Sequence, residues 1–62
     1  MTTDRTRRRR ALDAMRSLVA AYGWQEESLL VDHAAEVLGG GDAARSLAQA
    51  VFDKHYKIMG AN

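Results

Sequence analysis

Hydrophobic residues recur with helical spacing in three segments of the chain, and two glycine-containing breaks separate these segments. The first hydrophobic stripe consists of Ala11, Leu12, Met15, Leu18, Val19 and Tyr22. Intervals of three and four residues place such positions on one helix face, so the stripe predicts a helix over about residues 6–22. This helix is expected to end at Gly23, because glycine adopts most readily the left-handed conformation that follows many helices.

Two further stripes predict two further helices. The second stripe consists of Leu30, Val31, Ala34, Val37 and Leu38. It predicts a helix over about residues 26–38, whose acidic start at Glu26 and Glu27 suits the positive end of a helix dipole. The third stripe consists of Ala44, Leu47, Ala48, Val51, Phe52, His55, Ile58 and Met59, with Tyr56 beside it. It predicts a helix over about residues 42–59, with the Asp42 side chain as its N-terminal cap.

No proline interrupts these segments, and no alternating strand pattern competes with them. The sequence therefore predicts an all-α fold, a compact domain of three helices that spans residues 1–62 as a single unit. Arginine side chains near a helix N-terminus oppose the positive end of the dipole, so residues 1–6 are expected to fray as a basic arm.

The hydrophobic core is expected to be small. Hydrophobic residues make up 47% of the 62 positions, but eleven of them are alanine, which buries little area. Small domains of this kind usually need disulfides, a metal or a second chain, and this chain contains no cysteine. We therefore expect self-association, first of all as a homodimer, or binding to a larger protein partner.

Charge is divided unevenly along the chain although the net charge is only +1. Residues 1–24 contain six arginines and two aspartates, a balance of +4, whereas residues 25–62 contain three basic and six acidic residues, a balance of −3. A molecule with two oppositely charged ends can attract an anionic polymer, or the acidic end of another copy, to its basic end.

The basic end carries one dense cluster, made of Arg5, Arg7, Arg8, Arg9 and Arg10. Guanidinium groups suit phosphate oxygens and carboxylates, so the cluster is a candidate contact for nucleic acid or for an acidic partner. Four consecutive positions cover nearly the whole circumference of a helix, so they cannot all face one groove. The other interpretation is a solvated helix end that favours solubility.

A second group of candidates is apolar, and it comprises Trp24, Phe52, His55, Tyr56 and Met59. Trp24 follows the helix-ending glycine and is either a lid on the helical domain or an anchor in a protein interface, where tryptophan is favoured. His55 interrupts the third stripe and is either a core histidine with a hydrogen-bond partner or a residue at the rim of an interface.

One local resemblance bears on DNA binding. The stretch RRRRALDAMRSLVAAYGW is similar to the first helix of TetR-type repressors, in which a basic start and a Gly-aromatic step precede the DNA-reading pair of helices. The following stretch departs from that family, since it has three glycines in place of a tight turn and lacks early polar residues in its third segment. The resemblance therefore stops at Trp24.

Other chemistry finds little support. His33 and His55 lie 22 residues apart without a metal-ligand spacing, the serines have no base at a suggestive distance, and no Lys-Ser/Thr pair follows the glycines. No apolar run is long enough for a membrane span. We expect a cytoplasmic, non-enzymatic regulatory or interaction protein without cofactor, metal or small-molecule substrate, acting through helix-mediated protein contacts. The alternative is a small dimeric nucleic-acid-binding protein that places its arginine cluster on phosphates.

Overall fold

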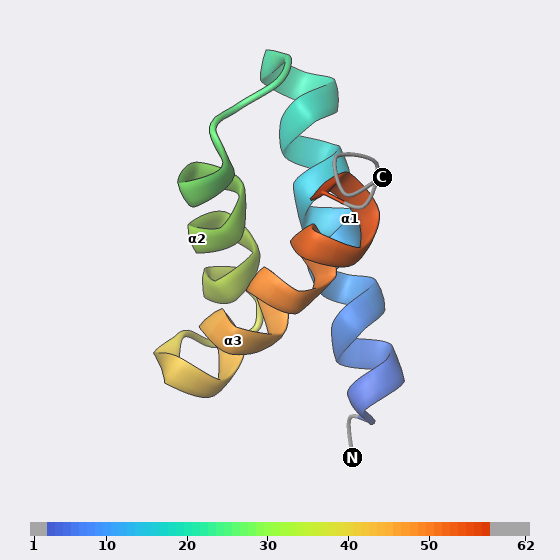
Figure 1. Ribbon diagram of the computed structural model, residues 1–62, viewed down its shortest axis with the longest axis vertical. Helices are drawn as coiled ribbons and strands as arrows, with labels where there is room; N and C mark the ends of the chain where they lie inside the picture. The colour runs from blue at the N-terminus through green and yellow to red at the C-terminus, as the bar shows by residue number, and fades with distance from the viewer. Residues whose placement is uncertain (1–2, 58–62) are drawn as a thin grey trace.

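The computed structural model describes residues 3–57 of the chain. Three helices follow one another, α1 (Asp4–Tyr22), α2 (Glu27–Val37) and α3 (Gly41–Phe52), and a π-helical turn η1 (Asp53–Lys57) continues α3. Each of the three helices packs against the other two (Figure 1). The described part of the chain contains no strand, and the prediction of an all-α, three-helix domain is confirmed.

Helix α1 begins at Asp4, two residues before the expected start, because Thr3 caps it. The Thr6 amide donates to the Thr3 hydroxyl oxygen at 3.1 Å, and the Arg7 amide donates to the Thr3 carbonyl oxygen at 3.0 Å. At the other end Gly23 adopts a φ of 85° and its amide donates to the Val19 carbonyl at 2.7 Å, as expected of a terminating glycine. The predicted fraying of residues 1–6 concerns motion and stays a prediction, and residues 1 and 2 lie outside the described range.

The connection between α2 and α3 is a compact glycine turn. The Gly39 amide donates to the Glu36 carbonyl at 3.0 Å, and the Gly40 amide donates to the Ala35 carbonyl at 2.8 Å. This pair of bonds is the Schellman arrangement that ends many helices. Gly39, Gly40 and Gly41 all have positive φ angles, of 107°, 77° and 92°, so each of the three positions favours glycine for its backbone conformation.

Asp42 does not cap α3 as predicted. The helix begins one residue earlier than expected, Gly40 occupies the cap position, and no side chain accepts a hydrogen bond from the free amides there. The reason is the preceding turn, which places three glycines in succession before α3 can begin. The Asp42 carboxylate lies in the first turn, where a negative charge still favours the helix dipole.

The core lies where the three helices meet, and half of its buried residues are alanine. The buried residues are Ala11, Ala14, Met15, Leu30, Val31, Ala34, Ala35, Leu38, Ala44, Ala48, Val51 and Phe52. Because alanine has the smallest apolar side chain, half of the core positions remove little apolar area from water. The largest fully buried side chains are Met15, Leu30, Val31 and Val51, so these four dominate the apolar area removed from water.

In the first two predicted stripes, two residues are exposed and lie outside this core. Tyr22 is 76% exposed, because the last turn of α1 extends past the start of α2 and nothing covers it there (Figure 1). Val37 is 48% exposed, and Ala35 is buried in its place. Helix α2 packs against both α1 and α3, which turns its buried face toward Val31, Ala35 and Leu38.

The third predicted helix continues to Lys57, but its type changes, since α3 ends at Phe52 and the π-helical turn η1 follows. A π-turn takes more residues per turn than an α-helix, and this rotates residue 55 away from the face that Phe52 occupies. His55 is therefore exposed rather than part of the stripe, and Tyr56 packs against the core instead. Ile58 and Met59 lie outside the described residues.

Candidate protein-interaction surfaces

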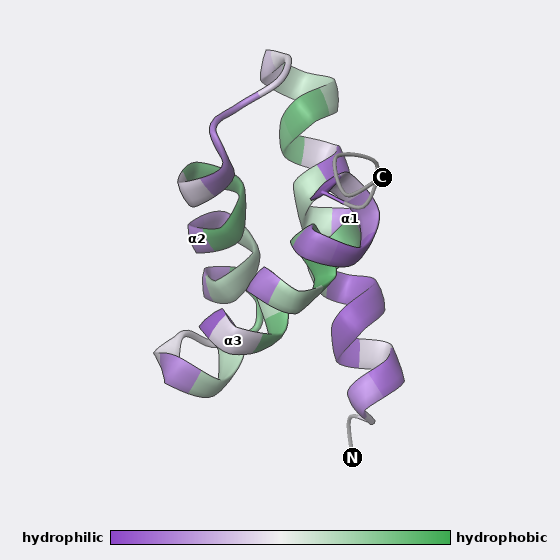
Figure 2. Ribbon diagram, in the orientation of Figure 1, coloured by the Kyte–Doolittle hydropathy of each residue, from purple (hydrophilic) through white to green (hydrophobic). Residues whose placement is uncertain are grey.

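The first seven residues of α1, residues 4–10, form what we call the arginine arm. The first buried residue of α1 is Ala11, so the arm extends about 10 Å beyond the core at 1.5 Å per residue. Figure 2 shows this part of the helix as almost continuously hydrophilic, whereas the upper half of α1 is largely hydrophobic. The arm has five arginines and one aspartate, a balance of +4.

Two of the arm's arginines pair with carboxylates of their own helix. Arg8 Nε donates to Asp4 Oδ2 at 2.9 Å, and Arg9 Nε lies 3.9 Å from Asp13 Oδ2. Arg10 and Arg16, each three residues from Asp13 in the sequence, form no ion pair with it. Within residues 3–57 the other arginines of α1 have no ion-pair partner; they are Arg5, Arg7, Arg10 and Arg16.

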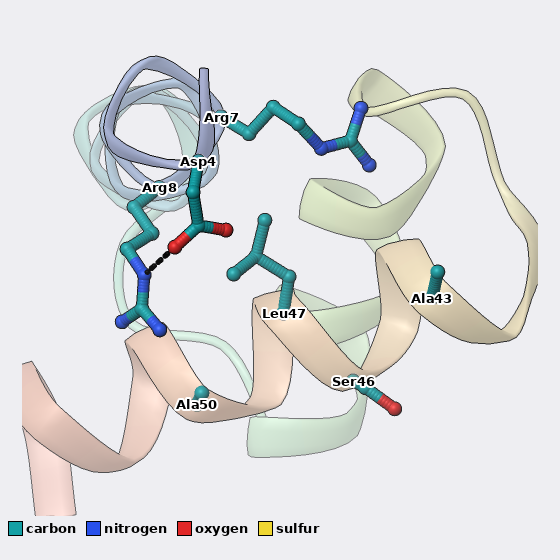
Figure 3. A pocket seen from close by; sticks show the side chains of 7 residues that line it. All are labelled: Asp4, Arg7, Arg8, Ala43, Ser46, Leu47 and Ala50. Atoms are coloured by element: carbon teal, nitrogen blue, oxygen red, sulfur yellow. Dashed lines mark hydrogen bonds and ion pairs between the residues drawn. The ribbon is translucent and has the colours of Figure 1, made fainter. Parts of the chain in front are cut away.

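The arm and α3 together line an open groove of about 450 Å³, which sequence reasoning did not find. The arm contributes Asp4, Arg7 and Arg8 to its wall, and α3 contributes its floor of Ala43, Ser46, Leu47 and Ala50. Figure 3 shows Arg7 extending over the open side, while Leu47 rises toward the arm between Arg7 and the Asp4–Arg8 pair. We call this feature the arm groove.

Three aromatic residues predicted as interface candidates come together at the end of α3. The ring centroids of Trp24 and Tyr56 are 5.5 Å apart in an edge-to-face arrangement, and those of Phe52 and Tyr56 are 5.3 Å apart. Trp24 also lies 6.3 Å from Phe52, so the three rings form one cluster. Phe52 is 3% exposed, whereas Trp24 remains 60% exposed although it packs on the other two rings.

Trp24 covers the buried Phe52, as a lid on the helical domain would, and presents its other side to solvent. Its role as an anchor in a protein interface stays a prediction. Of the remaining candidates in this group, His55 is exposed and outside the cluster, and Met59 lies beyond the described residues.

A polar network next to the cluster fastens η1 to the start of α2. Lys57 Nζ lies 3.2 Å from Glu27 Oε2 and 3.6 Å from Asp53 Oδ1. Gln49 Nε2 donates to the same two carboxylates, at 2.6 Å and 3.1 Å. The hydrogen bond that Lys57 donates to Glu27, together with the charges of Glu27 and Asp53, raises the pKa of Lys57. The four-residue spacing of 49, 53 and 57 was visible in the sequence, but the contact with Glu27 was not.

A second bridge joins α2 to α3, between Asp32 Oδ1 and Arg45. With this bridge and the Lys57–Glu27 ion pair, two acidic side chains of α2 form contacts within the chain. The acidic charge of α2 is therefore partly balanced within the chain. The basic character of the arm, in contrast, remains largely uncompensated.

The described residues offer little for other chemistry. Between Thr3 and Lys57 no group of three or more His, Cys, Asp or Glu side chains could hold a metal ion. Over the same range, no helix has the length and apolar composition needed to cross a membrane. The described residues present two candidate surfaces, one aromatic and one cationic, at different places on the helical domain.

Comparisons of the sequence with protein-family models, with curated proteins and with solved structures give no significant match.

Proposed function

We propose that this protein is a small non-enzymatic interaction protein that associates with a second copy of itself through the Trp24 surface. One observation carries the proposal, which is that Trp24 is 60% exposed while its ring is held against Phe52 and Tyr56. Tryptophan is enriched among the residues that dominate binding energy. A ring already fixed by its neighbours loses little conformational entropy when a partner covers it, which favours association.

A second copy is the partner that the core composition favours. Half of the buried residues are alanine, so the domain removes little apolar area from water by itself. A two-fold symmetric dimer uses the same patch on both subunits, and an exposed planar ring can cover its counterpart across the axis. Burial of Trp24 in this way would increase the apolar area removed from water beyond what the small core of one chain provides.

Sedimentation equilibrium from about 1 µM to about 1 mM tests this proposal, a range that covers typical weak and moderate dimers. We expect dimers for the native chain and a shift of the dissociation constant by at least tenfold for Trp24→Ala, the loss typical of a hot-spot residue. Tyr22→Ala is the matched control, since Tyr22 is 76% exposed but lies outside the cluster. A native chain that stays monomeric throughout, or a Trp24→Ala variant that dimerises unchanged, would refute the proposal.

The alternative function, binding of nucleic acid, is favoured by a separate observation. Arg5, Arg10 and Arg16 are exposed and have no ion-pair partner in the described part of α1. Anisotropy of a labelled DNA duplex at several salt concentrations tests this, because each phosphate contact contributes about −0.9 to the slope of log affinity against log salt. Arg5→Gln and Arg10→Gln are each expected to reduce the slope by about one. No binding at low salt would exclude this alternative.

A further inference from the structure

The arm groove combines a charged wall with an uncovered helix surface. Its arm wall extends about 10 Å beyond the core, and the α3 floor from Ala43 to Ala50 spans a similar length at 1.5 Å per residue. The two helices cross at this place, since Figure 3 shows α1 almost along its axis while α3 runs across the view, and Leu47 lies between them. The α3 floor by itself therefore has the length of about two helical turns.

The floor suits close approach of another backbone. Ala43 and Ala50 are exposed and Ser46 lies between them, so small side chains occupy the side of α3 that faces the groove. Leu47 alone projects from this surface, and it is only partly buried against the core. An incoming helix can pack its own apolar residues around Leu47 in the helix-in-groove mode.

The charge of the arm wall determines which charge a bound partner should carry. Arg7 is half-buried, and no carboxylate within residues 3–57 pairs with it, although Arg8 beside it has Asp4. A guanidinium that has lost part of its hydration gains most from a carboxylate that can accept two hydrogen bonds. The arm as a whole contributes a balance of +4, which attracts an acidic segment to this end of the molecule.

We infer that the arm groove binds an acidic amphipathic helix of a partner protein, with its apolar stripe on Leu47 and a carboxylate on Arg7. The apolar floor favours a peptide over a nucleic-acid backbone, which would cover Leu47 and the alanines with charged phosphates. The inference extends the proposed function to a second protein contact. It uses a different surface from Trp24, so the two can fail separately.

The test uses a fluorescein-labelled, acetylated and amidated helical peptide of about three turns. It contains glutamate, alanine and leucine, with the leucines on one stripe and the glutamates beside it. A peptide with lysine in place of glutamate is the charge control, and a DNA duplex is the competitor of another class. Anisotropy gives the affinity, and amide chemical shifts of the ¹⁵N-labelled full chain locate the peptide.

We expect the acidic peptide to bind and the lysine peptide not to bind. Arg7→Gln should weaken binding by about tenfold, which corresponds to the loss of one charge-assisted hydrogen bond. Ala50→Phe should weaken it as much by filling the groove, whereas Arg10→Gln, which removes an equal charge from the arm outside the groove, should have less than threefold effect. Shifts should concentrate at residues 4–8 and 43–50.

Three results would overturn the inference. They are failure of the acidic peptide to bind, equal losses for Arg7→Gln and Arg10→Gln, and binding that Ala50→Phe leaves intact. Binding of the DNA duplex with equal sensitivity to both arginines would assign the arm to nucleic acid instead. Trp24→Ala should leave peptide affinity unchanged, which separates this result from the outcome for the proposed dimer.

Discussion

Replacement of Gly40 by alanine should destabilise the domain through backbone strain alone. Gly40 has a φ of 77° and a ψ of 179°, a region that is essentially restricted to glycine. A Cβ atom added at this position meets no atom within 4 Å, so a steric clash contributes nothing. Strain of this kind amounts to about 1–3 kcal/mol. A 62-residue domain has a total stability of roughly 3–9 kcal/mol.

Urea unfolding followed by circular dichroism measures this loss, since the described fold is almost entirely helical. In thermal scans the same change should lower Tm by at least about 4 °C, because 1 kcal/mol corresponds to about 4–8 °C for a domain of this size. Ser46→Ala, an exposed substitution in α3, is the control and should change stability by less than about 0.5 kcal/mol. A Gly40→Ala variant as stable as the native chain would show that the turn does not need this conformation.

Three further predictions concern the core, the arm and the polar network. Met15→Ala should cost about 2–5 kcal/mol, because Met15 is fully buried, and a loss below about 1 kcal/mol in urea unfolding would contradict the packing described. Thr3→Ala should weaken the cap of α1 by about 1 kcal/mol and speed amide hydrogen exchange at residues 5–8, while exchange in the core stays unchanged. The raised pKa of Lys57 means that its ion pair with Glu27 stabilises the fold fully below the ordinary lysine pKa and is lost as pH rises through the raised value. The difference in urea midpoint between the native chain and Lys57→Gln should therefore be present at pH 7 and disappear at high pH, and a difference independent of pH would argue against this pair.

The periodicity of apolar residues was sufficient to predict the number of helices and most of their boundaries. Gly23 ends α1 as predicted, and the start of α2 is correct to within one residue. These features depend on local spacing and on the conformational preferences of single residues, both of which a sequence shows directly. The exposure of Val37 depends instead on how α2 packs against two neighbouring helices at once, and local spacing does not show this.

The candidate surfaces were also predictable only in part from the sequence. Trp24 was predicted separately from the patch of Phe52 and Tyr56, and the structure joins Trp24 to these two rings through contacts between residues 28 or more positions apart. The arm groove could not be predicted, because it exists only where the start of α1 passes α3. The π-turn was equally absent from the sequence pattern, since the spacing of the third stripe continues without a break through His55.

The long first helix also has a kinetic consequence. Helix α1 has 19 residues, a length of about 28 Å, and its backbone dipole has its positive end at the arm, with no basic residue in its last turn. The side-chain charges and the peptide dipoles of this helix therefore add rather than cancel. In the field of an anionic surface the molecule experiences a torque that turns the arm forward before contact. Collisions would begin from a narrow range of orientations, so encounter rates with such partners should fall steeply as ionic strength rises.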